Sequence, residues 1–258
     1  MNQKQQKHFV LVHGVCMGAW NWYKLIPQLE SIGHKVTALN LAACGTNTHK
    51  IEDVHTFADY SKPLLEFLAS LDPNEKVILV GHSFGGMSTA LAMEKFPEKI
   101  AVGIFIAAFI PDTIHQPSYV IQEYIERYPA SGWLDSEVLF DGTKMVILPG
   151  INFLSTKFFQ LCSIEDLELL KLLKRVGSFF IEDLSEAKNF SKKGYESVHR
   201  VYVVANEDLA IPVEFQQWMI QNAGIDVVNV INGADHMAML SKPQELRVCL
   251  LDIVEKYA

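Results

Sequence analysis

One serine lies where the pattern of a strand changes into the pattern of a helix. Residues 77–80 are four branched apolar residues, typical of a short buried strand, and apolar residues at helical spacing begin at Met87. Between them stands Gly-His-Ser-Phe-Gly, with Ser83 at its centre. A motif of this kind between a strand and a helix predicts a tight turn that exposes the hydroxyl, with glycines on both sides because larger residues would clash. The predicted chemistry is nucleophilic attack by Ser83.

A serine nucleophile needs a general base, and the base needs a carboxylate to orient it. His236 follows the last apolar stretch of strand type, and Asp208 follows the one before it. The order serine, acid, histidine is the one that accompanies this motif. We therefore predict His236 as the base and Asp208 as the acid. Glu207 is expected to point away, and Asp235 is poorly placed to reach the ring of its direct neighbour.

The negative oxygen that forms during attack on a carbonyl needs two N–H donors. One is expected from Phe84, the residue after the nucleophile, at the N-terminus of the following helix. The other is expected from the loop after an early strand, where the sequence reads His13-Gly14-Val15. We predict the N–H of Val15 as this second donor, whereas His13 is expected to brace its turn.

Buried apolar stretches alternate with segments of helical periodicity along most of the chain. This alternation predicts a mostly parallel sheet covered by helices on both faces, with ligands at the carboxyl ends of the strands. Together with the serine motif it indicates the α/β-hydrolase fold. The strands are expected at residues 8–13, 35–41, 77–80, 100–110, 200–205 and 227–231. Helices are expected at residues 22–32, 57–71 and 164–174 and around residues 246–254. Pro27 conflicts with the first of these helices, which is expected to kink or to start late.

The pattern changes between residues 109 and 181, where branched apolar strands give way to aromatic and long side chains. We interpret this part as an inserted, mainly helical cap over the carboxyl edge of the sheet. Residues 1–108 and 182–258 are then the first and second parts of one hydrolase core.

Composition excludes several classes of function. The chain of 258 residues has a formal net charge of −8 and a pI of about 5.6, which argues against nucleic acids and anionic membranes as partners. The N-terminal stretch is polar and no apolar run is long enough to span a membrane, so the expected compartment is the cytoplasm. The four cysteines show no metal-ligand spacing and are expected to be reduced and mostly buried, and no histidine cluster suggests a metal.

Beyond the serine motif, long stretches of the chain resemble the plant methylesterase family of α/β-hydrolases. The resemblance extends over nearly the whole chain, the cap included. The residues that carry it are 7–14, 33–39, 81–87, 92–100, 207–216 and 233–240.

The resemblance implies a cofactor-free serine esterase that cleaves the methyl ester of a small plant metabolite. Such a metabolite is a hormone such as salicylate, jasmonate or indole-acetate, or an indole alkaloid. By likeness to the family, Gly14, Tyr124, Trp133 and Met237 are candidates for substrate binding, and the aromatic residues of the cap would enclose the acyl group. Family members are often homodimers, so a homodimer is the assembly that the resemblance implies.

The sequence departs from the commoner family pattern at Met17, Asn40 and Cys44, which leaves the identity of the substrate open. Three other functions are conceivable on the same scaffold. Hydrolysis followed by loss of carbon dioxide, and a receptor with incidental hydrolysis, are alternatives. A hydroxynitrile lyase is disfavoured, because the related lyases carry a threonine at the position of Gly14 and a lysine at that of Met237.

Overall fold

The computed structural model describes residues 6–140 and 143–258, so most of the polar N-terminal stretch lies outside the described residues. Its centre is a six-stranded sheet in the order β2-β1-β3-β4-β8-β9, and each of its five strand pairings is parallel. These strands are β1 (His8–Val12), β2 (Lys35–Leu39), β3 (Val77–His82), β4 (Ile100–Ile106), β8 (Arg200–Ala205) and β9 (Val227–Ile231).

Helices cover both faces of this sheet, because alternate strand residues feed two separate apolar cores. In β1, Val10 and Val12 join the core beneath α2, α3 and α8, whereas Phe9 and Leu11 join the core beneath α1, α9 and α10. The helices of these layers are α1 (Ile26–Glu30), α2 (Phe57–Ser70), α3 (Gly85–Lys95), α8 (Val213–Asn222), α9 (Ala238–Ser241) and α10 (Pro243–Tyr257). The expected α/β-hydrolase architecture is confirmed.

Two element boundaries lie four residues away from the ends of the predicted ranges, and the other ends of predicted strands and helices lie closer. The fourth strand was expected to reach residue 110 but ends at Ile106, because the chain turns at Ala107, whose φ is 41°. The first helix, for which Pro27 predicted a kink or a late start within residues 22–32, begins late, at Ile26, with Pro27 in its first turn. Proline is accepted there because the N–H groups of the first turn have no acceptor within the helix, so the N–H that proline lacks costs no hydrogen bond.

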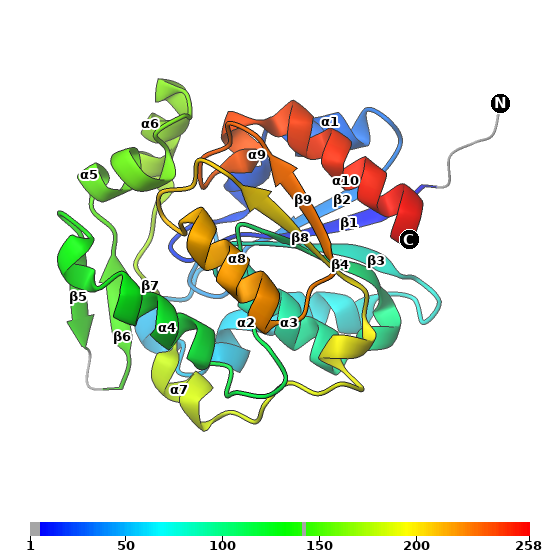
Figure 1. Cartoon of the computed structure of the whole chain (residues 1–258), viewed down its shortest axis with the longest axis horizontal. Coiled ribbons are helices and arrows are strands. Elements are labelled where there is room, and N and C mark those ends of the chain that lie inside the picture. The colour runs from blue at the N-terminus through cyan, green and yellow to red at the C-terminus, as the bar shows by residue number, and fades with distance from the viewer. Residues whose placement is uncertain (1–5, 141–142) are drawn as a thin grey trace.

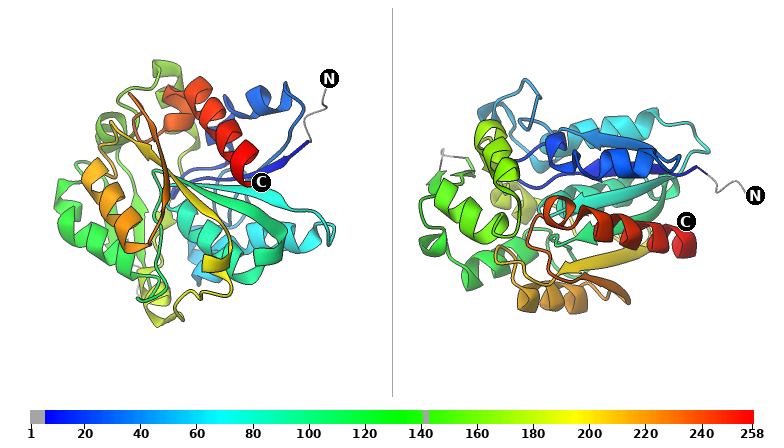
Figure 2. Two further views of the ribbon diagram at one scale, coloured as in Figure 1. Left: turned by 45° about the vertical axis from the view of Figure 1, so that its right-hand side comes forward. Right: turned by 90° about the horizontal axis from the view of Figure 1, so that it is seen from above.

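The part of the chain between β4 and β8 forms a separate group of elements at one end of the sheet. Figures 1 and 2 show this group lying beyond the ends toward which the strands of the sheet point. Most of its elements are helices, as expected, but it also contains a three-stranded antiparallel sheet, β5-β6-β7. Its elements are α4 (Tyr119–Arg127), β5 (Glu137–Phe140), β6 (Met145–Leu148), α5 (Ile151–Phe153), a π-helix (Leu154–Phe158), α6 (Ile164–Leu173), β7 (Gly177–Ser178) and α7 (Ile181–Glu186).

Within the described ranges, no helix is both long and apolar enough to cross a bilayer. The four cysteines are free, with Cys16 and Cys44 buried and Cys162 and Cys249 partly exposed. Half of the thiols are therefore less buried than the sequence suggested.

Candidate active site

Ser83 lies on the turn between β3 and α3, in the left-handed region with φ 54°. The two glycines of the motif make this turn possible. A Cβ atom on Gly81 would lie 2.4 Å from Oγ1 of Thr89, and one on Gly85 would lie 2.5 Å from the carbonyl oxygen of His13. Because real Cβ atoms do not approach this closely, glycine is required on both sides of the serine. The tight turn expected from the sequence is present, but Ser83 is buried, with an exposed fraction of 5%, and is not exposed as predicted.

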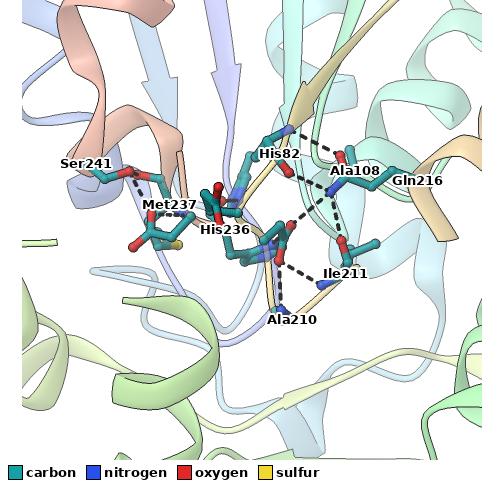
Figure 3. Close-up of polar contacts among 12 residues, drawn as sticks. His82, Ala108, Ala210, Ile211, Gln216, His236, Met237 and Ser241 are labelled. Carbon is teal, nitrogen blue, oxygen red and sulfur yellow. Dashed lines mark hydrogen bonds and ion pairs between the residues drawn. The ribbon is translucent and has the colours of Figure 1, made fainter. Parts of the chain in front are cut away.

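Asp208 and His236, from loops after neighbouring strands, form a buried pair. Nδ1 of His236 donates to Oδ2 of Asp208 at 2.7 Å, and the exposed fractions of the two residues are 0% and 3%. The other carboxylate oxygen, Oδ1, accepts the N–H groups of Ala210 and Ile211, each at 2.8 Å. Figure 3 shows these two residues and Gln216 on one side of His236. The carboxylate is thus held by its own loop and fixes the tautomer of the imidazole.

The ring of His236 lies beside the serine turn. His82, the residue before the serine, donates from Nε2 to the carbonyl oxygen of His236 at 2.8 Å, and the two rings are 4.6 Å apart. Phe158 packs edge-on against the other side, with ring centroids 4.6 Å apart. Nε2 of His236 is buried and has no hydrogen-bonding partner among the described residues. It therefore makes no hydrogen bond to the hydroxyl of Ser83 in this structure. Catalytic hydrogen bonds are often long before substrate binds.

The two predicted oxyanion donors lie on segments that touch each other. The loop that carries Val15 follows β1, and the close approach of Gly85 to the carbonyl oxygen of His13 packs this loop against the start of α3. Among the described residues, the backbone N–H groups of Val15 and Phe84 donate to no other residue. Both groups are therefore free to bind a negative oxygen.

An apolar cavity of about 40 Å³ lies between the core and the cap elements. It is lined by Val15, Cys16, Met17, Tyr124, Trp133, Ile147, Pro149, Phe153, Leu154, Phe158 and Phe179. No charged side chain is among them. Because Phe158 lines the cavity and also contacts His236, the cavity adjoins the base.

The four predicted substrate-binding residues lie in three different places: on the cavity wall, against the serine and in the core. Tyr124 and Trp133 line the cavity. Gly14 lies against the serine, since a Cβ atom on it would be 2.9 Å from Cβ of Ser83. Met237 is fully buried in the core beneath α9 and α10 and is absent from the cavity wall.

Sequence reasoning did not select several residues of the cavity wall. Cys16 was considered only as a thiol, and Ile147, Pro149 and Leu154 were not considered. Phe153, Phe158 and Phe179 were predicted only as a group, as aromatic residues of the cap that enclose the acyl group. Their common signal is apolar character, which core residues share. Periodicity could not have separated a residue that lines the cavity from one that packs against its neighbours.

Burial keeps two histidines near the serine turn, His13 and His82, neutral. It lowers the pKa of His13 to about 4, against a smaller raising effect of its hydrogen bond to the carbonyl oxygen of Gly14. The pKa of His82 also lies well below its usual range, first because of burial and then because of the nearby His236. In the described part of the chain, no three His, Cys, Asp or Glu side chains are arranged to hold a metal ion.

The sheet, the serine turn and the paired Asp208 and His236 define the class of protein. A family model described as the alpha/beta hydrolase fold matches residues 7–243. Polyneuridine aldehyde esterase from Rauvolfia serpentina is 54% identical over 98% of this chain and 97% of its own. Salicylic acid-binding protein 2 from Nicotiana tabacum is also 54% identical, over 98% and 99% of the two chains.

Methylesterase 1 from Arabidopsis thaliana is 49% identical over 99% of this chain and 98% of its own. The crystal structure of polyneuridine aldehyde esterase superimposes with a TM-score of 0.94 at 53% identity, covering 97% of this chain and 100% of that one. The chain belongs to the plant methylesterase family of α/β-hydrolases and is a carboxylic ester hydrolase.

Proposed function

We propose that this protein is a serine methylesterase that hydrolyses the methyl ester of a small plant metabolite, with Ser83, His236 and Asp208 as its catalytic triad. The observation that carries the proposal is the 2.7 Å hydrogen bond between Asp208 and a buried His236, whose free Nε2 lies beside the serine turn. An imidazole oriented in this way accepts a proton on Nε2.

The mechanism follows from this geometry. Nε2 of His236 takes the proton of the Ser83 hydroxyl while the oxygen attacks the ester carbonyl, and the N–H groups of Val15 and Phe84 bind the resulting oxyanion. Collapse of this intermediate breaks the bond to methanol, which leaves with the proton from His236. Water, deprotonated by the same histidine, then attacks the acyl-enzyme and releases the acid and Ser83.

The cavity favours an uncharged, flat acyl group. Its wall contains Tyr124, Trp133 and three phenylalanines but no charged side chain, which suits an aromatic ring better than a charged metabolite. A cavity of about 40 Å³ is far smaller than the roughly 300–1,000 Å³ of most small-molecule sites, so side chains of the cap must move when substrate enters. The relatives named for salicylic acid and for polyneuridine aldehyde suggest which substrates to test first.

A panel of methyl esters tests the proposal: methyl salicylate, methyl jasmonate, methyl indole-acetate and alkaloid methyl esters. Wild type should release methanol from at least one of them, and Ser83→Ala should lower that rate by about 10⁴-fold or more. Equal rates for the two proteins would refute the role of Ser83 and would leave a metabolite receptor as the better interpretation.

Hydrolysis followed by decarboxylation is a second candidate, because one of the relatives at 54% identity is named polyneuridine aldehyde esterase. The aldehyde in the name of this relative is a carbonyl group. A carboxylic acid with a carbonyl in the β position loses carbon dioxide readily once hydrolysis has released it from its ester. Analysis of the products from a β-carbonyl methyl ester separates the two outcomes. Accumulation of the intact acid would rule this candidate out.

A further inference from the structure

A second buried carboxylate lies directly before the base and is not part of the triad. Asp235 is fully buried, and its two oxygens have different partners. Oδ1 accepts the hydroxyl of Ser241 at 2.7 Å and the N–H of Met237 at 3.1 Å. Oδ2 accepts the N–H of Leu161 at 2.9 Å and the thiol of Cys162 at 3.3 Å. The thiol of Cys162 also lies 3.7 Å from Oδ1. The carboxylate therefore joins the cap to residues 232–241, which carry His236, include the short helix α9 and are called the base loop.

The cap residues concerned belong to a short segment, 158–162, which we call the strap. It touches both loops that carry the predicted base and acid. Phe158 packs on the ring of His236 with centroids 4.6 Å apart. Nε2 of Gln160 donates to the carbonyl oxygen of Glu207, the residue before the acid, at 2.6 Å. Figure 3 shows Met237 and Ser241, two residues of the base loop, on the opposite side of His236 from the residues around the acid.

The strap also forms part of the cavity. Phe158 ends the π-helix that begins at Leu154, and both side chains line the cavity wall. Hence the strap forms part of the cavity wall and covers the imidazole of His236. It is also hydrogen-bonded to the two loops that lie on either side of this imidazole. Its described hydrogen bonds to the base loop all end on one side chain, the carboxylate of Asp235.

We propose that Asp235 is a positioning residue: it binds the strap to the base loop and so holds His236 in place against the serine turn. The inference rests on the triad proposed above. The four partners of Asp235 named here are neutral donors, so the carboxylate is held by hydrogen bonds with fixed directions. Without the bonds to Oδ2, the strap is free to lift, Phe158 leaves the imidazole and the ring gains freedom to turn.

The variant Asp235→Asn tests this with little change of volume. An amide has one acceptor oxygen in place of two, so it can accept the N–H of Met237 or the N–H of Leu161 but not both. In either orientation, the NH₂ group faces an N–H donor on one side, and the link between the base loop and the strap is broken. The rate at which phenylmethanesulfonyl fluoride inactivates the enzyme reports the nucleophilicity of Ser83 with a small reagent. We expect this rate and kcat for the best methyl ester to fall about tenfold, at a temperature where circular dichroism shows the variant folded.

Ser241→Ala is the matched control, because it removes a bond to the same carboxylate on the side away from the strap. It should change the inactivation rate by no more than about twofold. Cys162→Ser keeps a hydrogen-bond donor to Oδ2, so it too should change the inactivation rate by no more than about twofold. A folded Asp235→Asn variant that is inactivated as fast as wild type would overturn the inference, and so would an equal fall in Asp235→Asn and Ser241→Ala.

If Asp235→Asn does not fold, the strap is loosened from its own side with Gln160→Leu combined with Cys162→Val. This double variant should also lower the inactivation rate, and an unchanged rate would overturn the inference. Failure of the proposed function gives a different result. In that case Ser83→Ala would hydrolyse esters as fast as wild type, whatever the strap variants do.

Discussion

A Cβ atom on Gly14 would lie 3.2 Å from Oγ of Ser83 and 2.9 Å from its Cβ. The glycine therefore leaves open the space from which the hydroxyl reaches a carbonyl carbon. We expect Gly14→Ala to lower kcat/KM for methyl esters by about tenfold or more, because the added methyl displaces the serine from its attacking position. Steady-state kinetics on the best ester of the panel measure this.

Gly132→Ala provides the control for this variant, since a Cβ atom there meets nothing within 4 Å. It adds the same methyl group at an exposed position of the cap and should leave kcat/KM unchanged. A Gly14→Ala enzyme as active as Gly132→Ala would show that the serine does not need this space.

Asp208→Asn should abolish most of the activity while the fold persists. The amide oxygen keeps the bonds from the N–H groups of Ala210 and Ile211, but its NH₂ cannot accept the proton on Nδ1 of His236. The imidazole then takes the wrong tautomer, and we expect kcat to fall by about 10⁴-fold. Turnover of the panel ester, with the melting temperature measured in parallel, checks this.

Asp112→Asn is a suitable companion, because Asp112 is another buried carboxylate that accepts N–H bonds from its own loop. Its partners lie on His115 and Asn222, outside the proposed site. This variant should retain turnover. Retained turnover in Asp208→Asn would instead show that another carboxylate orients the base.

His13 makes stability depend on pH. Its Nδ1 donates to the carbonyl oxygen of Gly14, its Nε2 accepts the N–H of Leu41, and burial lowers its pKa from 6.5 to about 4. Between these values the unfolded chain binds a proton that the native state does not. The stability is therefore complete above pH 6.5 and falls as the pH drops towards 4, by about 3 kcal/mol for this one group.

Urea titrations at several pH values from 7 to 4 measure this loss. His13→Gln keeps a donor and an acceptor but does not titrate, so the fall in its unfolding free energy over the same range should be smaller by about that amount. His82 is buried as well and continues to contribute in the variant. Identical pH profiles for wild type and His13→Gln would contradict the prediction.

Trp133 lines the cavity, and we expect it to restrict the size of the acyl group. Its ring stacks on Phe153 with centroids 6.1 Å apart, and its indole N–H donates to the carbonyl oxygen of Tyr128 at 3.1 Å. Trp133→Ala should enlarge the cavity and shift the ratio of kcat/KM towards bulky alkaloid esters, by about tenfold relative to methyl salicylate. Trp218→Ala removes an indole from α8 that does not line the cavity and should leave the ratio unchanged.

Strong local patterns predicted most of the core. The strand at residues 227–231 was predicted at its observed bounds, because apolar residues in a short stretch between turns have few alternatives. The long apolar stretch that begins at Ile100 was predicted four residues too far. Its last residues are buried where the chain leaves the sheet at Ala107, and burial in a strand and burial in a loop give the same apolar pattern.

The cap was predicted least well. Residues 137–140 and 145–148 pair as β5 and β6, although three of the four side chains in β5 are exposed. Such a hairpin lacks the continuous burial that marks the strands of the central sheet. Met237 was selected by resemblance, yet its side chain points into the core, since the direction of one residue in a loop depends on how that loop packs.

The sequence alone determined the order of elements, the tight turn at Ser83 and the two loops that carry Asp208 and His236, because glycine requirements and apolar periodicity act between neighbours in the chain. Only the tertiary structure decided which atoms meet: the 2.7 Å bond between Asp208 and His236, the cavity wall and the partners of Asp235. These contacts join residues far apart in the chain, and their geometry depends on the packing of the cap against the sheet, which no local pattern records.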